Sequence, residues 1–176
     1  MQNIYITGTG FWIPDNGLTT NDEVVSSYNT YVDNFNLENS EAISAGSLEA
    51  MSHSSSEFIE KASGIKTRYL YDKHNCLDPN RMKPVTRPEL PDNTSILAEM
   101  GVDSAKKAIK NAGISVDDID GVILGTSHSA RNYPAIAIEI QEALGIDGYA
   151  YDMLVGCSST TFAISNAYSD IASGLA

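Results

Sequence analysis

The chain has 176 residues, enough for one domain with a sizeable core, and its 23 acidic against 11 basic residues give a net charge of −12. That charge argues against a nucleic-acid partner, because such partners require a basic surface. No apolar run approaches the roughly 20 residues of a membrane span, so we expect no membrane insertion. The strand-like start at residues 2–7 does not resemble a signal peptide, and two dissimilar cysteines fit a reducing, cytoplasmic setting.

The first third of the chain predicts a strand and two helices. Residues 4–7 alternate like a strand before Gly8-Thr-Gly10, which lacks the third glycine of a dinucleotide loop. Thr20 and Glu23 form a capping box that starts a helix through about residue 31. A polar turn at 33–39 is expected to end it, and a second helix then runs over 41–62 to Gly64. His53 is interpreted as a surface residue of that helix, without a partner.

Residues 65–71 alternate like a further strand, and a proline-rich loop follows over 73–92. Six of the eleven basic residues gather here: Lys66, Arg68, Lys73, Arg81, Lys83 and Arg87. Such a basic patch would suit phosphates or an acidic protein, and the alternative is a solvated loop. His74 and Cys76 lack a third metal ligand, and neither cysteine has metal-ligand spacing to the other, so we predict no metal site.

The middle of the chain predicts two more helices and a buried strand. A helix over 94–112 is expected to be capped by Thr94 or Asn93 and ended by Gly113. A turn at 115–118 and a short apolar strand over 121–126 follow. Tyr133-Pro134 is expected to open the next helix with proline in its first position, and Gly145 to end it. Its expected apolar face consists of Ile136, Ile140, Ala143 and Leu144.

The last predicted unit joins a strand over 150–155, a turn at Gly156-Cys157 and a helix to about Ser173, with residues 158–160 in the helix's first turn. Helix N-termini carry unpaired N–H groups and a partial positive charge, which favours the thiolate of a cysteine placed there. The alternative is a buried structural cysteine at a strand–helix junction. Helices that alternate with buried strands predict an α/β fold for residues 1–176 as one domain.

Asp152-Met-Leu-Val-Gly-Cys-Ser-Ser-Thr-Thr-Phe-Ala resembles the nucleophile segment of type III ketoacyl-[acyl-carrier-protein] synthases, which are thiolase-like condensing enzymes. The similarity covers most of the chain. Residues 6–14 with Thr20, Asn21 and Glu23 resemble the opening of that family. Residues 62–68 resemble its Thr-Gly-Ile-x-x-Arg segment, and residues 97–112, 119–127 and 133–145 follow in the family's order.

The resemblance implies the N-terminal half of a thiolase-like fold, with α-β-α layers and a mixed sheet. It also implies decarboxylative Claisen condensation of an acyl-CoA primer with malonyl-acyl-carrier protein, with Cys157 as the nucleophile and its N–H as an oxyanion donor. Coenzyme A enters as a thioester substrate, and no cofactor is implied. Tyr133 matches an aromatic that reaches across a homodimer interface. Phe58 stands where the family often has a Trp. We predict that Phe58 and Thr126, like Tyr133, bind the substrate.

Several departures shape these expectations. The family's catalytic His, Asn and Gly-rich loop are absent, so we expect a missing C-terminal half, and this piece alone to be inactive. Ala62 replaces a common Arg of the coenzyme A site. Segments of about 29–56 and 72–92 resemble insertions, which favours a primer longer than acetyl. Two alternatives stay open: a catalytically silent half that pairs with a partner chain, and another thiolase-like enzyme that condenses acyl-CoA esters.

Overall fold

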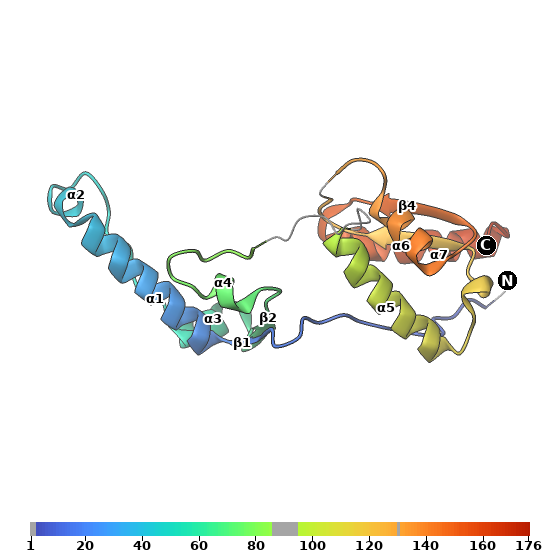
Figure 1. Cartoon of the computed structure of the whole chain (residues 1–176), viewed down its shortest axis with the longest axis horizontal. Coiled ribbons are helices and arrows are strands. Elements are labelled where there is room, and N and C mark those ends of the chain that lie inside the picture. The colour runs from blue at the N-terminus through green and yellow to red at the C-terminus, as the bar shows by residue number, and fades with distance from the viewer. Residues whose placement is uncertain (1–2, 86–94, 130) are drawn as a thin grey trace. The chain divides into compact units, whose positions relative to one another are not determined.

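The computed structural model describes residues 3–85, 95–129 and 131–176, and these fall into two compact units. We call Met1–Trp12 with Pro88–Ala176 the cysteine unit, and Ile13–Arg87 the α1 unit. Figure 1 shows the order of the helices and strands along the chain. The prediction of a single domain over 1–176 stays a prediction, and Asn93, Thr94, Arg87 and residues 86–92 of the predicted loop lie outside the described residues.

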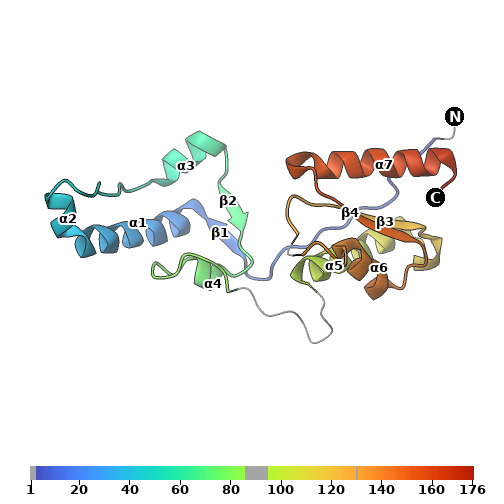
Figure 2. The same ribbon diagram turned by 90° about the horizontal axis from the view of Figure 1, so that it is seen from above.

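The cysteine unit is a layered α-β-α arrangement. Two parallel strands pair in register from Gly121 with Tyr149 to Gly125 with Met153. Helices α5 and α6 cover one face of this pair and α7 covers the other, as Figure 2 shows. The buried cluster consists of Ala98, Ile136 and Ile140, with Val122 and Leu124 of the sheet packed against it. The elements are α5 (Ile96–Ala112), β3 (Gly121–Gly125), α6 (Ile136–Leu144), β4 (Tyr149–Met153) and α7 (Ser159–Ser173), with 3-10 turns at Val116–Asp118 and Gly156–Ser158.

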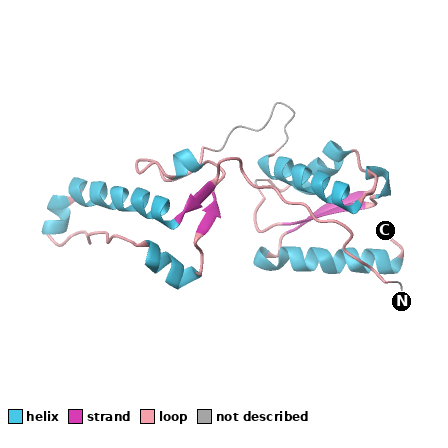
Figure 3. Ribbon diagram, turned by 90° about the horizontal axis from the view of Figure 1, so that it is seen from below, coloured by secondary structure: helices cyan, strands magenta, loops and turns pink. Residues whose placement is uncertain are grey.

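The strand expected at residues 4–7 is not formed, and Figure 3 shows the start of the chain as loop. The residues that follow it, 8–11, lie against α5. A Cβ added at Gly8 would be 2.3 Å from the Ala108 carbonyl oxygen, so only glycine permits this approach. Asn111 Nδ2 donates to the Thr9 carbonyl at 2.8 Å, and Lys107 Nζ to the Phe11 carbonyl at 3.1 Å. Helix side chains thus bind backbone carbonyls that a neighbouring strand would otherwise bind.

The described part of the α1 unit, residues 13–85, contains an antiparallel pair of short strands and four helices. The strands pair in register from Leu18 with Tyr69 to Thr20 with Thr67. Its elements are β1 (Leu18–Thr20), α1 (Asn21–Glu38), α2 (Ser40–Ser44), α3 (Ser56–Ser63), β2 (Thr67–Tyr69) and α4 (Lys73–Cys76). Among the described residues the strands therefore form two separate two-stranded sheets, and the expected mixed sheet is not seen.

Two helix predictions in the α1 unit were wrong. Helix α1 continues to Glu38 through the polar run at 33–39, because Asn36 and Asn39 place their amides on backbone groups instead of ending the helix. The helix expected over 41–62 is two short helices separated by residues 45–55. Ser55 caps α3 afresh by accepting from Phe58 N at 3.1 Å. His53 lies in this linking segment, and its Nε2 is 2.7 Å from Asp33 Oδ1, so it has a partner.

Most predicted caps are confirmed. Thr20 and Glu23 form the capping box of α1, and Gly64, Gly113 and Gly145 end α3, α5 and α6 in the left-handed conformation. The start of α5 differs from the prediction, because Ser95 is the N-cap and accepts from Ala98 N at 3.1 Å. No helix among the described residues has the length and apolarity needed to cross a bilayer.

Candidate active site

The candidate site lies at the carboxyl ends of β3 and β4, where the loops lead into α6 and α7. In parallel sheets this edge is where ligands bind most often. Thr126, directly after β3, donates its N–H to the Met153 carbonyl of β4 at 3.1 Å. The chain then turns through the 3-10 turn Gly156–Ser158 into α7, and Cys157 occupies the middle of that turn. The prediction that Cys157 is in the turn between the last strand and the last helix is confirmed.

Cys157 is exposed, so the alternative of a buried structural cysteine does not hold. The α-helix begins at Ser159, two residues after the thiol. Ser158 is the N-cap rather than part of the first helical turn, and its side chain makes no cap hydrogen bond. Gly156 has a φ of +57°, a conformation that favours glycine and lets the chain reverse before Cys157.

Ser159 anchors the turn. Its side chain is buried, and its Oγ accepts from Val155 N at 2.8 Å. The same hydroxyl donates to two carbonyl oxygens, that of Thr126 at 2.9 Å and that of Gly156 at 2.8 Å. The end of β3 also lies against this point, since a Cβ at Gly125 would be 2.8 Å from the Ser159 carbonyl carbon.

Asp152 performs a second anchoring role. Its carboxylate accepts from Ile136 N and Ala137 N, both at 2.8 Å, and thereby caps α6 from β4. Carboxylates are stabilised at helix N-termini by these N–H groups and the helix dipole. The expectation that Pro134 is the first helical residue was wrong: α6 begins at Ile136, where the Asp152 carboxylate binds the free N–H groups.

The loop before α6 carries Tyr133, whose side chain is 82% exposed. Arg131 holds this loop through an ion pair with Glu139 of α6 and a hydrogen bond from its Nε to the Pro134 carbonyl at 3.2 Å. Glu139 also accepts from Ser95 N at 2.7 Å, which ties the start of α5 to α6. Tyr133 therefore lies at the surface, in a loop that Arg131 connects to α6.

The other predicted site residues fall in two places. Thr126 lies at the sheet edge, where its Oγ1 donates to the His128 carbonyl at 2.8 Å. Phe58 belongs to the α1 unit, is 66% exposed, and borders a groove of about 580 Å³ lined by Val24, Tyr28, Ile59 and Met82 among others. The substrate-binding roles of Tyr133, Phe58 and Thr126 stay predictions, as does the nucleophilic role of Cys157.

Sequence reasoning missed the anchors Ser159, Glu139 and Asp152. Asp152 was noted as part of the family pattern, but its contact with α6 depends on residues 15 and 16 positions away. Ser159 resembles any serine of a first helical turn, and nothing in its neighbours distinguishes it. Within the described residues, no three His, Cys, Asp or Glu side chains gather as metal ligands would.

No protein-family profile matches the chain. It is 52% identical over 152 residues to a β-ketodecanoyl-[acyl-carrier-protein] synthase of Pseudomonas aeruginosa, covering 86% of this chain and 43% of that protein. It is 35% identical over 130 residues to a β-ketoacyl-[acyl-carrier-protein] synthase III of Mesorhizobium japonicum, covering 73% of this chain and 34% of that protein. The chain thus spans less than half the length of these curated relatives.

Solved structures show the same fold. The crystal structure of 3-oxoacyl-[acyl-carrier-protein] synthase III from Aquifex aeolicus matches with a TM-score of 0.63 at 24% identity, over 96% of this chain and 40% of that one. The corresponding enzyme of Pseudomonas aeruginosa also gives 0.63, at 17% identity, over 96% and 38%. The predicted thiolase-like α/β fold is therefore confirmed. The resemblance predicted from the Cys157 segment is therefore confirmed: over 73–86% of its length this chain is similar to β-ketoacyl-[acyl-carrier-protein] synthases, which are thiolase-like condensing enzymes.

Proposed function

We propose that the complete protein condenses an acyl-CoA primer with malonyl-acyl-carrier protein, using Cys157 as the nucleophile that holds the acyl group. The observation that supports this most is the exposed thiol of Cys157 at the carboxyl edge of β3 and β4, on a chain 52% identical to a ketodecanoyl synthase over 86% of its length. A nucleophile at that edge is accessible to a substrate, while its backbone is fixed by the strand before it and the helix after it.

The proposed reaction has two stages. The Cys157 thiolate attacks the thioester carbonyl of the primer, a new carbon–sulfur bond forms, and the coenzyme A thiolate leaves. Malonyl-carrier protein then loses CO2 by cleavage of its carbon–carboxylate bond. The electron pair left on the α-carbon attacks the acyl carbonyl, the carbon–carbon bond forms, and the Cys157 thiolate is released. In this proposal the Cys157 N–H stabilises the negative charge that develops on the carbonyl oxygen.

The proposed primer is longer than acetyl. The similar protein from Pseudomonas aeruginosa is named for a ketodecanoyl product. Addition of two carbons to give a ten-carbon chain requires an eight-carbon primer. A medium-length acyl-CoA is therefore the first substrate to test, with acetyl-CoA as the comparison.

The proposed partners follow from the same reaction. Tyr133, exposed beside α6, would contribute to a homodimer interface, and Thr126 would contact the substrate at the sheet edge. Phe58 would stack on the coenzyme A base, because its ring borders an apolar groove of the α1 unit. We propose that the reaction takes place in the cytoplasm, because a reducing compartment keeps Cys157 a free thiol.

The deciding experiment is mass spectrometry of the complete protein after incubation with octanoyl-CoA. We expect a covalent octanoyl adduct that disappears in Cys157→Ala, since Cys157 is the exposed thiol that follows β4, whereas Cys76 belongs to the α1 unit and is partly buried. Cys76→Ala is the matched control and should keep the adduct. Burial raises the pKa of the Cys76 thiol, and the charge of Asp72 adds to this, so we expect little thiolate at Cys76.

An adduct of full intensity on Cys157→Ala would contradict the proposal. Product formation would then separate the remaining alternatives. A ketoacyl product with malonyl-carrier protein supports the proposed condensation, whereas a product formed only from two acyl-CoA esters would indicate the other thiolase-like chemistry. An adduct-free, stable protein would indicate a silent partner chain.

A further inference from the structure

The Ser159 hydroxyl bonds to more backbone groups than an ordinary cap does. Its side chain is 2% exposed, although the neighbouring Cys157 and Ser158 are exposed. It accepts one N–H, that of Val155, and lies within 2.9 Å of two carbonyls, those of Thr126 and Gly156. A hydroxyl has one proton, so the two carbonyls share it. This one oxygen therefore joins β3, the chain after β4 and the start of α7.

These contacts join the residues on either side of Cys157. Val155 and Gly156 precede Cys157, and Ser159 follows it by two residues, so the hydrogen bonds close a small loop around the thiol-bearing residue. The backbone of the same turn also forms hydrogen bonds of its own, from Ser158 N to the Val155 carbonyl at 3.3 Å and from Ser159 N to the Gly156 carbonyl. The Ser158 side chain adds none to the start of α7. The position of Cys157 therefore depends on Ser159 more than on the usual capping residue.

The bond to Thr126 sets the turn relative to the sheet. Gly125 leaves room for this contact, because a Cβ there would lie 2.8 Å from both the Ser159 carbonyl carbon and Thr160 N. The end of β3 and the start of α7 thus meet without an intervening side chain. A displacement of about 1 Å of a reacting group can reduce a catalysed rate by about 10²-fold, so a bond that fixes this junction bears directly on the nucleophile.

We propose that Ser159 is the positioning residue of the nucleophile: its hydroxyl holds the Cys157 turn against the end of β3. The inference rests on the proposed function, in which Cys157 accepts the acyl group. Ser159 itself touches no substrate in this proposal and acts only through the backbone of residues 155–157.

The test compares Ser159→Ala with Ser158→Ala in the complete protein, the same substitution one residue away. The rate constant of octanoyl transfer to Cys157 is measured at saturating octanoyl-CoA, with thermal unfolding followed in parallel. We expect Ser159→Ala to lower this rate constant by about 10- to 100-fold at temperatures where the variant is folded. The octanoyl-CoA concentration for half-maximal rate should change little, and Ser158→Ala should resemble the wild type. Ser159→Thr keeps the hydroxyl and should recover part of the rate.

A folded Ser159→Ala that acylates at the wild-type rate overturns the inference, and so does a Ser158→Ala that is equally slow. If Ser159→Ala does not fold, hydrogen exchange of the wild-type protein tests whether the Ser159 hydroxyl holds the turn. The Val155 amide should be protected although this residue is 45% exposed, and exchange at the rate of an unstructured peptide overturns the proposal. A wild type that forms no adduct removes the proposed function as well, and is thereby distinguished from failure of the positioning role alone.

Discussion

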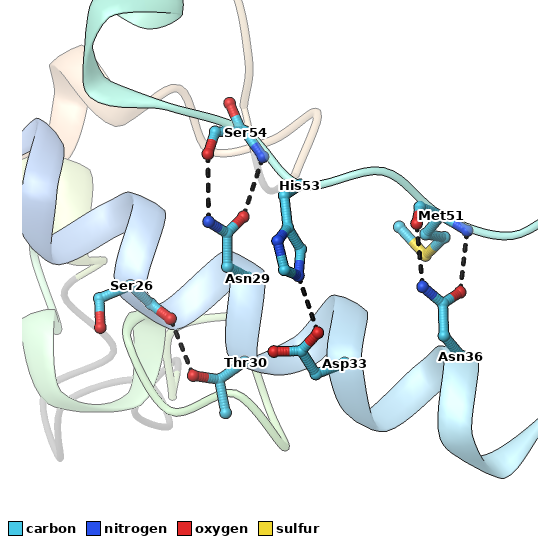
Figure 4. Close-up of polar contacts among 8 residues, drawn as sticks. All are labelled: Ser26, Asn29, Thr30, Asp33, Asn36, Met51, His53 and Ser54. Atoms are coloured by element: carbon cyan, nitrogen blue, oxygen red, sulfur yellow. Dashed lines mark hydrogen bonds and ion pairs between the residues drawn. The ribbon is translucent and has the colours of Figure 1, made fainter.

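The cysteine unit encloses an apolar cluster between α5, α6 and the parallel strands, whereas the only fully buried hydrophobic side chain among the described residues of the α1 unit is Val32. In the α1 unit, polar side chains hold the chain instead. Figure 4 shows Asn29 and Asn36, two helical turns apart on α1, each bound to the backbone of the linking segment, with the His53–Asp33 pair between them. Each amide donates to a carbonyl and accepts from the N–H of the same residue, Ser54 or Met51.

The two units are thus stabilised by different interactions, apolar burial in the cysteine unit and hydrogen bonds from amide side chains in the α1 unit. Apolar burial stabilises in proportion to area and tolerates modest changes of shape. Amide–backbone pairs are directional and fix one register of one segment against one helix. We therefore expect substitutions in the cysteine unit to act on global stability, and substitutions of the α1 asparagines to act on a single segment.

The largest effect is expected at Ile140, which is 4% exposed in the buried cluster. Ile140→Ala should lower the free energy of unfolding by about 2–5 kcal/mol, because it removes buried methyl groups and leaves a cavity beside Ala98 and Ile136. Urea unfolding of the complete protein measures this. Leu37→Ala on α1 is the control: that side chain is 76% exposed, and the change should stay within about 0.5 kcal/mol. Equal losses at the two sites would remove the contrast between the units.

The next effect is local. Asn36→Ala removes the acceptor of the Met51 amide, and Asn29→Ala removes that of the Ser54 amide. Because each substitution removes two hydrogen bonds, the free energy that protects the affected amide from hydrogen exchange should fall by about 1–3 kcal/mol. Hydrogen exchange resolved by residue measures both, and each variant serves as the control for the other amide. Asn34→Ala, at an exposed position of the same helix, should change neither. Loss of protection across the whole α1 unit in one variant would show that the segment and helix unfold together.

The smallest effect concerns pH. The hydrogen bond from Lys73, together with that from Thr20 N, lowers the pKa of Glu23 to about 2 from its usual 4.5. A carboxyl with a depressed folded-state pKa contributes stability above its unfolded pKa, and this is lost as pH falls toward the folded value. The difference in melting temperature between the wild type and Glu23→Gln should therefore be present at pH 6 and shrink between pH 4.5 and 2.

Because Glu23 is on the surface, this difference should be small and should decrease with added salt. Lys73→Gln tests its cause: the variant keeps the Thr20 contact, and NMR titration should show the Glu23 pKa moving back toward 4.5. A Glu23→Gln difference that remains unchanged at pH 2 would mean that the carboxylate charge is not what stabilises the start of α1.

Features with short-range causes were predictable from the sequence. The Thr20–Glu23 capping box spans three residues, and the glycines that end α3, α5 and α6 need only their own left-handed conformation. Strands β3 and β4 followed from apolar runs bounded by turn residues. The Cys157 turn was predictable in the same way, and its resemblance to a known nucleophile segment predicted the enzymes to which the chain proved similar.

Features with distant partners were not predictable. The asparagines within residues 33–39 indicated a turn, yet Asn36 binds Met51, 15 positions away, and the helix continues to Glu38. Pro134 indicated the first helical residue, yet the carboxylate of Asp152 sets the start of α6 from another element. The segment 4–7 has the alternation of a strand, but it forms no ladder with the described strands, and the residues after it, 8–11, lie against α5.

The sequence by itself determined the α/β character, the positions of most helix ends and the turn that presents Cys157, because each depends on the conformational preferences of a few adjacent residues. Only the tertiary structure decided that Cys157 is exposed, that Ser159 and Asp152 anchor the sheet edge, and that the α1 unit is held by amides. Those properties arise from hydrogen bonds and burial between residues that meet only after folding.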